Sequence, residues 1–428
     1  MREMKDSGIE WIGEIPDDWA MKRVKHIFTR KNEKAMQENP TILSLARDGV
    51  KVRDISNNEG QIAESYYNYN PVEEGDLLLN PMDLYSGANC SISKVQGVIS
   101  PAYINLKANE GTNPNFYDYY FKVQYWLMAF FSYGKGVSYD NRWTLNAETL
   151  MNYPVVTLPY EEQCKRADYL DHKCSQIDFI IARQQEVIEK LKAYKLSVIT
   201  EAVTKGLNPD VPMKDSGVDW IGEIPEHWTV SALRYGLENI QTGPFGSQLH
   251  AEDYIEDGIF VINPANIVEG CIVPDNRCSV TELKAQELSR HILNKGDIIF
   301  ARRGEMGRCA YFGGSFQQYL CGTGCIKIQC NANLMPEFIS WFLQTSCVKQ
   351  YLTLNSVGTT MANLNTTIIS GIPVVFPPIS EQEKVVEYIK NKICEIDCVL
   401  KNKLSIVEKL TEYKKSLIYE VVTGKKEV

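Results

Sequence analysis

The feature that most constrains this chain is a peptide that it contains twice. Residues 4–19 read MKDSGIEWIGEIPDDW and residues 213–228 read MKDSGVDWIGEIPEHW, with twelve identities in sixteen positions. A second duplication follows, because residues 162–206 match residues 381–425 at a constant offset of 219. The chain therefore consists of an opening motif, a variable block and a long conserved segment, and this order occurs twice.

The long conserved segments are predicted to be helices. Each follows a proline, has no proline or glycine in its interior, and ends at a glycine, Gly206 or Gly424, which is a common way for a helix to end. About 43 residues at a rise of 1.5 Å each give a length of roughly 65 Å.

Apolar residues recur along both helices at alternating steps of four and three, the pattern of a coiled coil. We call these positions the seam. They are Ile177, Ile181, Ile188, Leu191 and Val198 in the first helix, and Ile396, Leu400, Val407, Leu410 and Leu417 in the second. We expect the helices to pair with each other, antiparallel if an internal two-fold axis relates the halves. The alternative is that each helix packs separately on its own domain.

The variable blocks, residues 20–158 and 229–376, agree only sparsely. Short β-rich runs bounded by Gly, Asn and Pro, with helical stretches at 115–132 and 336–352, predict a mixed α/β (α+β) fold. Matching fragments such as GDLLL and GDIIF indicate a shared scaffold. The predicted order is a first domain at 1–159, a helix at 160–206, a second domain at 207–378 and a helix at 379–428, with an internal pseudo-two-fold repeat.

The composition excludes several classes of protein. The 12 cysteines and 5 histidines show no zinc-type spacing, and buried thiols such as Cys321, Cys325 and Cys330 are the simpler interpretation. We find no run of apolar residues long enough for a membrane span and no export signal, so we expect a cytoplasmic protein. The net charge of -9 indicates weak binding of nucleic acid by this chain alone.

The two duplications together resemble the specificity subunits of type I restriction-modification systems. The resemblance covers essentially the whole chain. It is carried by both opening motifs, GPFGSQL at 243–249, GDIIFARRG at 296–304, PPISEQEKV before the second helix, and the KLxxYKxSxIxEVVT pattern of both helices. In combination these motifs are specific, although each one alone is weak.

The resemblance implies a non-catalytic DNA-binding protein with two target recognition domains, each reading one half of a bipartite site in double-stranded DNA. The helices would set the spacing and dock two methyltransferase subunits, and restriction subunits would join the complex. S-adenosylmethionine, ATP and Mg are then expected only on partner subunits, with no cofactor bound by this chain. The sequence agrees, because it lacks both a phosphate-binding loop and the Asn-Pro-Pro-aromatic motif of amino-methyltransferases.

Candidate DNA contacts in the second block lie in three polar loops. Arginines read guanine edges, while glycines let backbone approach a ligand closely. The candidates are Arg302, Arg303 and Arg308; Gly243, Phe245 and Ser247; and Thr359, Thr360 and Asn363. The alternatives are an ion pair between one arginine and Glu305, and a structural turn in which Phe245 fills the core.

The matching positions of the first block are less basic. The candidates there are Tyr85 and Ser86, the loop residues Lys135, Ser138, Tyr139 and Arg142, and Arg47. The basic stretch KRVKHIFTRK at 22–31 could position phosphates, or it could be a solvated helix face.

The opening motif is predicted to be structural. Its apolar residues, such as Trp11, Trp19, Trp220 and Trp228, would fix each domain to the end of a helix. Two other classes of function stay open at this stage. One is a nuclease or phosphoryl-transfer enzyme with its site inside a variable block, and the other is a coiled-coil adaptor with no role at DNA.

Overall fold

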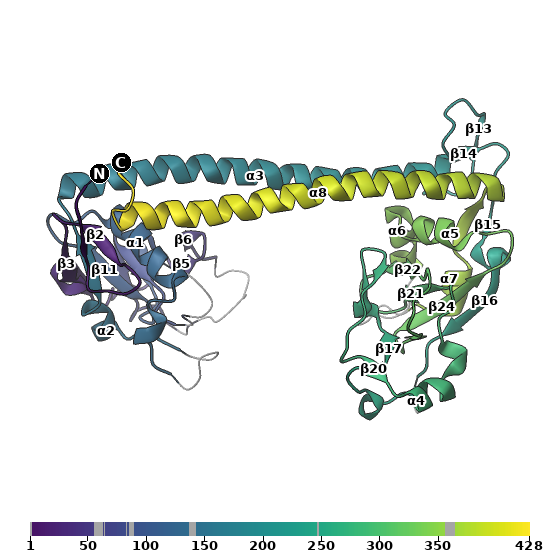
Figure 1. Cartoon of the computed structure of the whole chain (residues 1–428), viewed down its shortest axis with the longest axis horizontal. Helices are drawn as coiled ribbons and strands as arrows, with labels where there is room; N and C mark the ends of the chain where they lie inside the picture. Colours follow the sequence, from purple (N-terminus) through teal and green to yellow (C-terminus); the bar gives the residue numbers. More distant parts are fainter. Residues whose placement is uncertain are drawn as a thin grey trace. The chain divides into compact units, whose positions relative to one another are not determined.

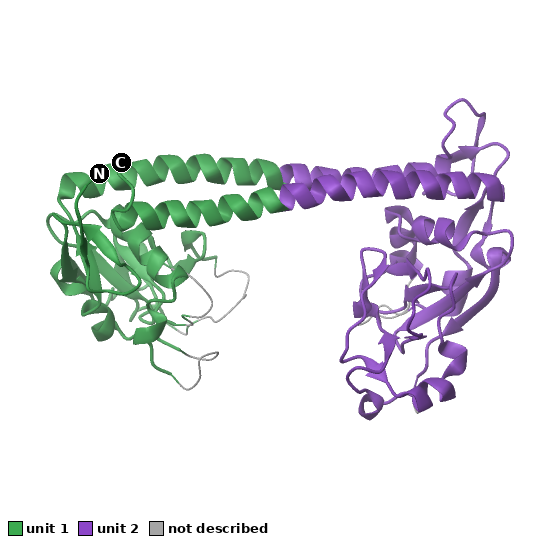
Figure 2. Ribbon diagram, in the orientation of Figure 1, with its two compact units in different colours: residues 1–185, 405–428 green, residues 186–404 purple. Residues whose placement is uncertain are grey.

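The chain divides into two compact units (Figure 2). Unit 1 comprises Met1–Gln185 and Ser405–Val428, and unit 2 comprises Glu186–Leu404. Each unit therefore contains a globular domain, the beginning of one long helix and the end of the other (Figure 1). The computed structural model describes residues 2–54, 63, 65–82, 84, 90–136, 143–245, 248–355 and 364–428.

The two long helices are α3 (Tyr160–Lys205) and α8 (Ile379–Val422). In unit 1, Lys414 Nζ donates to Asp178 Oδ1 at 2.7 Å, and Arg166 donates to the carbonyl of Val421 at 2.8 Å. Arg166, which lies nearer the start of α3, contacts α8 nearer its end than Asp178 does. The two helix segments of unit 1 therefore run antiparallel.

Unit 2 contains the counterpart of this helix contact. There Lys195 Nζ donates to Asp397 Oδ1 at 2.7 Å. Lys195 and Lys414 are 219 positions apart, as are Asp178 and Asp397. Each helix therefore contributes one lysine and one aspartate at equivalent positions. In unit 1 the lysine comes from α8 and the aspartate from α3, and in unit 2 the roles are reversed.

The seam residues face inward in both units. All ten are buried or half-buried, whereas most residues between them on the helices are exposed. The seam also contains Gln184, whose side-chain oxygen is buried without a hydrogen-bond partner among the described residues. Burial of the seam removes apolar surface from water, which is what stabilises such long helices.

Each domain is built around a four-stranded antiparallel sheet. In unit 1 the order is β4-β11-β8-β9, and in unit 2 it is β16-β24-β21-β22. The GDLLL and GDIIF fragments supply the equivalent strands β8 and β21. Helix α1 packs beside β9 in unit 1, and α5 packs beside β22 in unit 2. The predicted mixed α/β class is therefore correct.

The strands of unit 1 are short, and the bounds of its elements follow. They are β1 Met4–Asp6, β2 Glu14–Pro16, β3 Ala20–Arg23, β4 Phe28–Lys31, β5 Leu43–Ala46, β6 Gly49–Val52, β7 Asn70–Val72, β8 Leu77–Leu79, β9 Cys90–Ile92, β10 Gly97–Ile99, β11 Ile104–Ala108, α1 Pro114–Trp126, α2 Ala147–Met151 and β12 Pro154–Thr157.

Unit 2 has the same opening and closing strands and additional short elements between them. They are β13 Met213–Asp215, β14 Glu223–Pro225, β15 Thr229–Ala232, β16 Leu237–Thr242, β17 Ile259–Ile262, β18 Ile267–Val268, β19 Cys271–Ile272, β20 Ser279–Val280, α4 Glu282–Glu287, β21 Ile298–Ala301, β22 Cys309–Tyr311, β23 Tyr319–Cys321, β24 Cys325–Cys330, α5 Pro336–Leu343, α6 Ser346–Asn355, α7 Thr366–Ser370 and β25 Pro373–Phe376.

The two ends of each variable block are paired with each other. Strand β3 pairs with β12 in unit 1, and β15 pairs with β25 in unit 2, both antiparallel. Each block therefore leaves and returns to the conserved part of the chain at a single place. This arrangement lets the sequence between the strands diverge without moving the helix that follows.

The opening motif joins its domain to the end of a helix, as predicted, and it also contacts the second helix, which was not predicted. The indole N–H of Trp19 donates to Glu162 in the first turn of α3 at 3.3 Å, and Trp228 donates to Glu381 in the first turn of α8 at 2.9 Å. At the other helix end, a Cβ on Gly206 would lie 3.1 Å from the Trp228 ring. Each motif thus holds the start of one helix and the end of the other.

One alternative and one local prediction need correction. The basic stretch at 22–31 is not a helix face, because its residues form β3, a short 3-10 turn and β4. The single helical stretch predicted at 336–352 is two helices, α5 and α6. The basic stretch forms strands and not a helix because β3 and β4 each pair with a strand far along the chain. No local sequence pattern reveals such pairing. Cys321 and Cys325 are buried, as expected, whereas Cys330 is only half-buried.

Candidate nucleic-acid interface

In unit 2, several loops meet at one end of the four-stranded sheet. The chain leaves β21 at Arg302, whose backbone N–H donates to Gly324 O at 3.0 Å and whose carbonyl accepts from Leu364 N at 2.9 Å. The loop after β21 is thereby tied to the turn between β23 and β24 and to the segment that precedes α7. We call residues 243–245, 263–266, 302–308 and 322–324, together with Leu364, the unit 2 loop cluster.

Glycines make this close approach possible. A Cβ on Gly243 would overlap the carbonyl oxygen of Gly322, and a Cβ on Gly322 would overlap Asn263. The backbone N–H of Gly243 donates to Cys325 O at 2.9 Å. The contribution of Gly322 and Gly324 was not predicted from the sequence, although the GTG between two apolar runs signals a tight turn.

The arginines of the cluster differ in their surroundings. Arg303 is exposed and Arg302 is half-buried. Burial, and then the adjacent positive charge of Arg303, lowers the pKa of the Arg302 guanidinium. Two neighbouring arginines at the surface of a loop cluster are side chains of the kind that contact a phosphate or the acceptor edge of a guanine.

Arg308 forms contacts within the cluster. Its Nε donates to Glu305 at 3.0 Å, and one terminal nitrogen donates to the carbonyl of Pro264 at 3.3 Å. Glu305 also lies 3.5 Å from Lys349. The hydrogen bond from Arg308 is the main reason why the pKa of Glu305 is lowered. Here the structure shows the ion pair that was the alternative to DNA contact.

Phe245 lies on the surface of the cluster. Its side chain is 57 % exposed, so it does not fill the core. An exposed aromatic ring beside a glycine turn has the shape needed to insert at a groove or stack on a base. Ser247, Thr359, Thr360 and Asn363 lie outside the described residues.

Unit 1 builds the equivalent cluster with different side chains. The backbone N–H of Leu145 donates to Pro81 O at 2.8 Å. Leu145 and Leu364 are 219 positions apart, and Pro81 follows β8 as Arg302 follows β21. This bond is the counterpart of the one between Leu364 and Arg302. Both domains thus join the loop after the central strand to the segment before the last short helix.

The described candidates of unit 1 lie on exposed loops. Lys135 is exposed and held by two backbone hydrogen bonds with Thr144, at 2.8 and 3.0 Å. Arg47 is exposed in the turn between β5 and β6. A Cβ on Gly49, the first residue of β6, would lie 3.5 Å from Ser91 Oγ of β9. Tyr85, Ser86, Ser138, Tyr139 and Arg142 lie outside the described residues.

A buried charge supports each sheet below its loops. In unit 1, Lys31 Nζ of β4 donates to the buried Asp76 at 2.8 Å, and Asn105 of β11 donates to the same oxygen at 3.2 Å. In unit 2 the lysine is on the other strand. Lys327 of β24 lies 4.0 Å from Asp297, and its β16 neighbour is Gln241. The lysine and the amide have exchanged strands.

The described residues contain no group of three or more His, Cys, Asp or Glu side chains arranged to hold a metal ion. Where the chain is described, none of its helices has both the length and the apolar character for crossing a membrane.

Comparison with known proteins shows which proteins this chain is similar to. Residues 239–407 match the family model described as the type I restriction modification DNA specificity domain. The MjaVIII specificity subunit of Methanocaldococcus jannaschii is 23% identical over 433 residues, covering 96% of this chain and 93% of that protein. The EcoBI specificity subunit of Escherichia coli is 22% identical, covering 96% of this chain and 87% of that protein.

Solved structures share the fold. A chain from a structural study of assembly and conformational transition of a type I restriction-modification system superposes with a TM-score of 0.70 at 13% identity, covering 96% of this chain and 99% of that one. The HsdS subunit of Thermoanaerobacter tengcongensis gives 0.51, also at 13% identity, with 96% and 98% covered. Both relatives are named as specificity subunits of type I restriction enzymes. The chain therefore contains a match to the type I restriction modification DNA specificity domain at residues 239–407, and along almost its whole length it is similar to proteins named specificity subunits of type I restriction enzymes.

Proposed function

We propose that each domain reads one half of a bipartite site in double-stranded DNA through its loop cluster. The observation that carries the proposal is the equivalent backbone bond from Leu145 to Pro81 and from Leu364 to Arg302. The two domains share this backbone framework but carry different side chains on it. Two domains that read different half-sites require this combination.

The charge distribution supports reading by a few side chains and weak binding by the chain alone. Residues 1–158 hold 16 basic and 20 acidic side chains, and residues 212–376 hold 11 and 16. Affinity for DNA depends on the number of phosphate contacts made by lysine and arginine. Partner subunits therefore have to supply most of the affinity, while the loop clusters supply the specificity.

The helices are proposed to set the distance between the half-sites and to dock two methyltransferase subunits. One side of the helix pair remains apolar outside the seam. In unit 1 it consists of Ile180, Ile406 and Tyr413, and in unit 2 of Val399, Val187 and Tyr194, with exposed fractions between 38% and 54%. We call these trios the docking flanks.

The docking flanks have the features of a repeated interface. Each residue of one trio is 219 positions from its counterpart in the other. Each flank residue directly precedes the first of the two core positions in its heptad. In an antiparallel helix pair, such residues lie on the same side of both helices, so each trio forms one apolar strip. A single kind of partner presenting one apolar helix face could occupy both strips.

The remaining parts of the proposal follow from this role. Restriction subunits would join the assembly, the complex would act in the cytoplasm, and S-adenosylmethionine, ATP and Mg would be bound by the partners. This chain would contribute sequence reading and geometry.

The sharpest test of the reading role is Arg302→Ala. The variant retains the two backbone bonds by which Arg302 ties the loop cluster together. Loss of one base contact costs about 1 to 3 kcal/mol. We expect relaxed specificity at one half-site and an unchanged second half-site, measured by methylome sequencing of cells that carry the complete system. Arg277→Ala is the control, because Arg277 is exposed in the same unit and pairs with Asp275 at 3.0 Å.

Exchange of a whole variable block separates this proposal from the other classes of function. Replacing residues 229–376 should change one half of the methylated motif. An unchanged motif would favour a structural adaptor. Cleavage or methylation of DNA by the purified chain without partners would favour an enzyme.

A further inference from the structure

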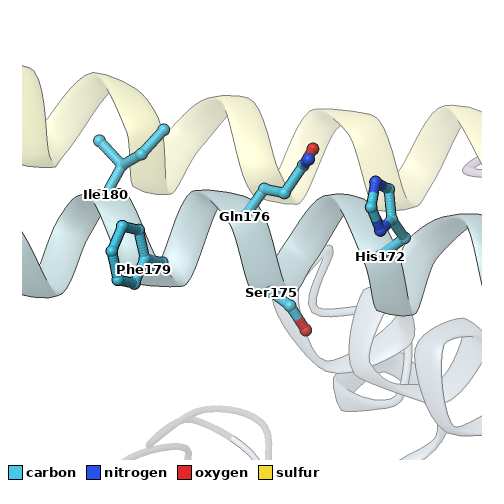
Figure 3. A pocket seen from close by; sticks show the side chains of 5 residues that line it. All are labelled: His172, Ser175, Gln176, Phe179 and Ile180. Atoms are coloured by element: carbon cyan, nitrogen blue, oxygen red, sulfur yellow. The ribbon is translucent and has the colours of Figure 1, made fainter.

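The two docking flanks are closely matched, but the helix surface beside them is not. In unit 1, this neighbouring surface belongs to α3 and lines an open pocket of about 580 Å³. Its lining residues are His172, Ser175, Gln176, Phe179 and Ile180. Figure 3 shows them in a row along α3, with Phe179 and Ile180 at one end and His172 at the other.

Phe179 is the dominant apolar group of this surface. Its ring is 63 % exposed, and the Arg183 guanidinium carbon lies 5.4 Å from the ring centroid. Phe179 directly precedes Ile180 of the docking flank. Both side chains line the same pocket, so a partner that covers Ile180 can also reach this ring.

The counterpart surface in unit 2 belongs to α8 and has no aromatic ring. The positions 219 residues later hold Asn391, Cys394, Glu395, Cys398 and Val399. Cys398 replaces Phe179, and it is exposed. Glu395 replaces the neutral Gln176, and it pairs with Lys392 at 2.8 Å. The second surface is therefore smaller in apolar area and carries an additional carboxylate.

We infer that the two flanks bind the methyltransferase subunit with unequal affinity, with unit 1 as the tighter site. This inference rests on the docking proposed above. Covering a phenylalanine ring removes far more apolar surface from water than covering a thiol, and the difference corresponds to roughly ten-fold or more in affinity. The partner then assembles in two steps, through an intermediate with one methyltransferase subunit on unit 1.

The test is a titration of the full chain with the methyltransferase subunit of its own system, followed by native mass spectrometry. The wild-type chain should show a populated one-to-one complex before the two-to-one complex, with dissociation constants separated about ten-fold or more. Phe179→Cys should weaken the first step and bring the two constants together. Cys398→Phe should tighten the second step.

The double variant with Phe179→Cys and Cys398→Phe provides a matched control, because it retains the composition of the chain. The first subunit should then protect unit 2 from hydrogen exchange before unit 1. If the wild type binds its two subunits in two equal steps while Tyr194→Ala and Tyr413→Ala still weaken docking, the inference of unequal affinity is wrong. The docking proposal would then still stand. Tyrosine variants that leave both steps unchanged, or flanks covered by a second copy of this chain, would overturn the docking proposal itself.

Discussion

At the scale of single residues, the loop cluster of unit 2 depends on the absence of a side chain at Gly243. A methyl group there would overlap the Gly322 carbonyl. We expect Gly243→Ala to lower the free energy of unfolding by about 1 to 3 kcal/mol, as overpacking does, and to abolish methylation of one half-site. Thermal unfolding and methylome sequencing check both effects. Gly313→Ala is the control, since its nearest atom lies 3.5 Å away on the Tyr311 ring.

The exchange of a buried lysine between strands gives a second prediction at this scale. Lys31→Gln leaves Asp76, which is 3% exposed, without its cation. Removal of one member of a buried pair costs about 3 kcal/mol or more. Adding Asn105→Lys transplants the arrangement of unit 2 and should recover most of the loss. Urea unfolding of the single and double variants measures this, and no recovery would contradict the equivalence of the two sites.

At the scale of elements, the opening motif and the start of α3 share a network of charges. Glu162 accepts hydrogen bonds from Arg2 at 2.6 Å and from Arg166 at 2.8 Å. Burial alone would raise the pKa of Glu162, but the hydrogen bonds from Arg2 and Arg166 outweigh burial and lower the pKa to about 2. The carboxylate is thus more acidic in the folded chain than in the unfolded chain.

This shift predicts a dependence of stability on pH. The contribution of Glu162 is complete above the unfolded pKa of about 4.3 and is lost as the pH falls toward the folded value. Glu162→Gln should therefore destabilise the chain near neutral pH and have a progressively smaller effect below about pH 4.3. Urea unfolding at several pH values measures the difference. Glu161→Gln changes an exposed neighbour in the same helix turn and should show no such trend.

At the scale of the whole molecule, both helices pass through both units, so their length is a candidate ruler. Adding one heptad to each helix preserves the seam and lengthens the connection by about 10.5 Å. This is roughly three base pairs of DNA at 3.4 Å each. The methylated motif should keep its letters and gain about that many unspecified positions. A motif with an unchanged gap would show that the helices do not set it.

The sequence by itself determined the repeat, the two long helices, their seam and the mixed fold, because each of these leaves a local or periodic pattern. The opening motif could be predicted as a structural element, since its tryptophans recur at fixed places. Even the ion pairs of Lys195 and Lys414 lie in register with the repeat.

Only the tertiary structure decided which loops meet. Gly322 and Gly324 join the cluster through strand pairing between segments far apart in the chain, and no local pattern encodes such contacts. The same holds for Lys31 and Lys327, which approach equivalent aspartates from different strands: Lys31 donates to Asp76, whereas Lys327 lies 4.0 Å from Asp297 and donates to the carbonyls of Arg290 and Ile292. The structure also shows that Arg308 is the arginine that pairs with Glu305. The sequence could not tell which of the three arginines forms this ion pair. Side-chain partners across a sheet are fixed by register, and register is set by the packing of the whole domain.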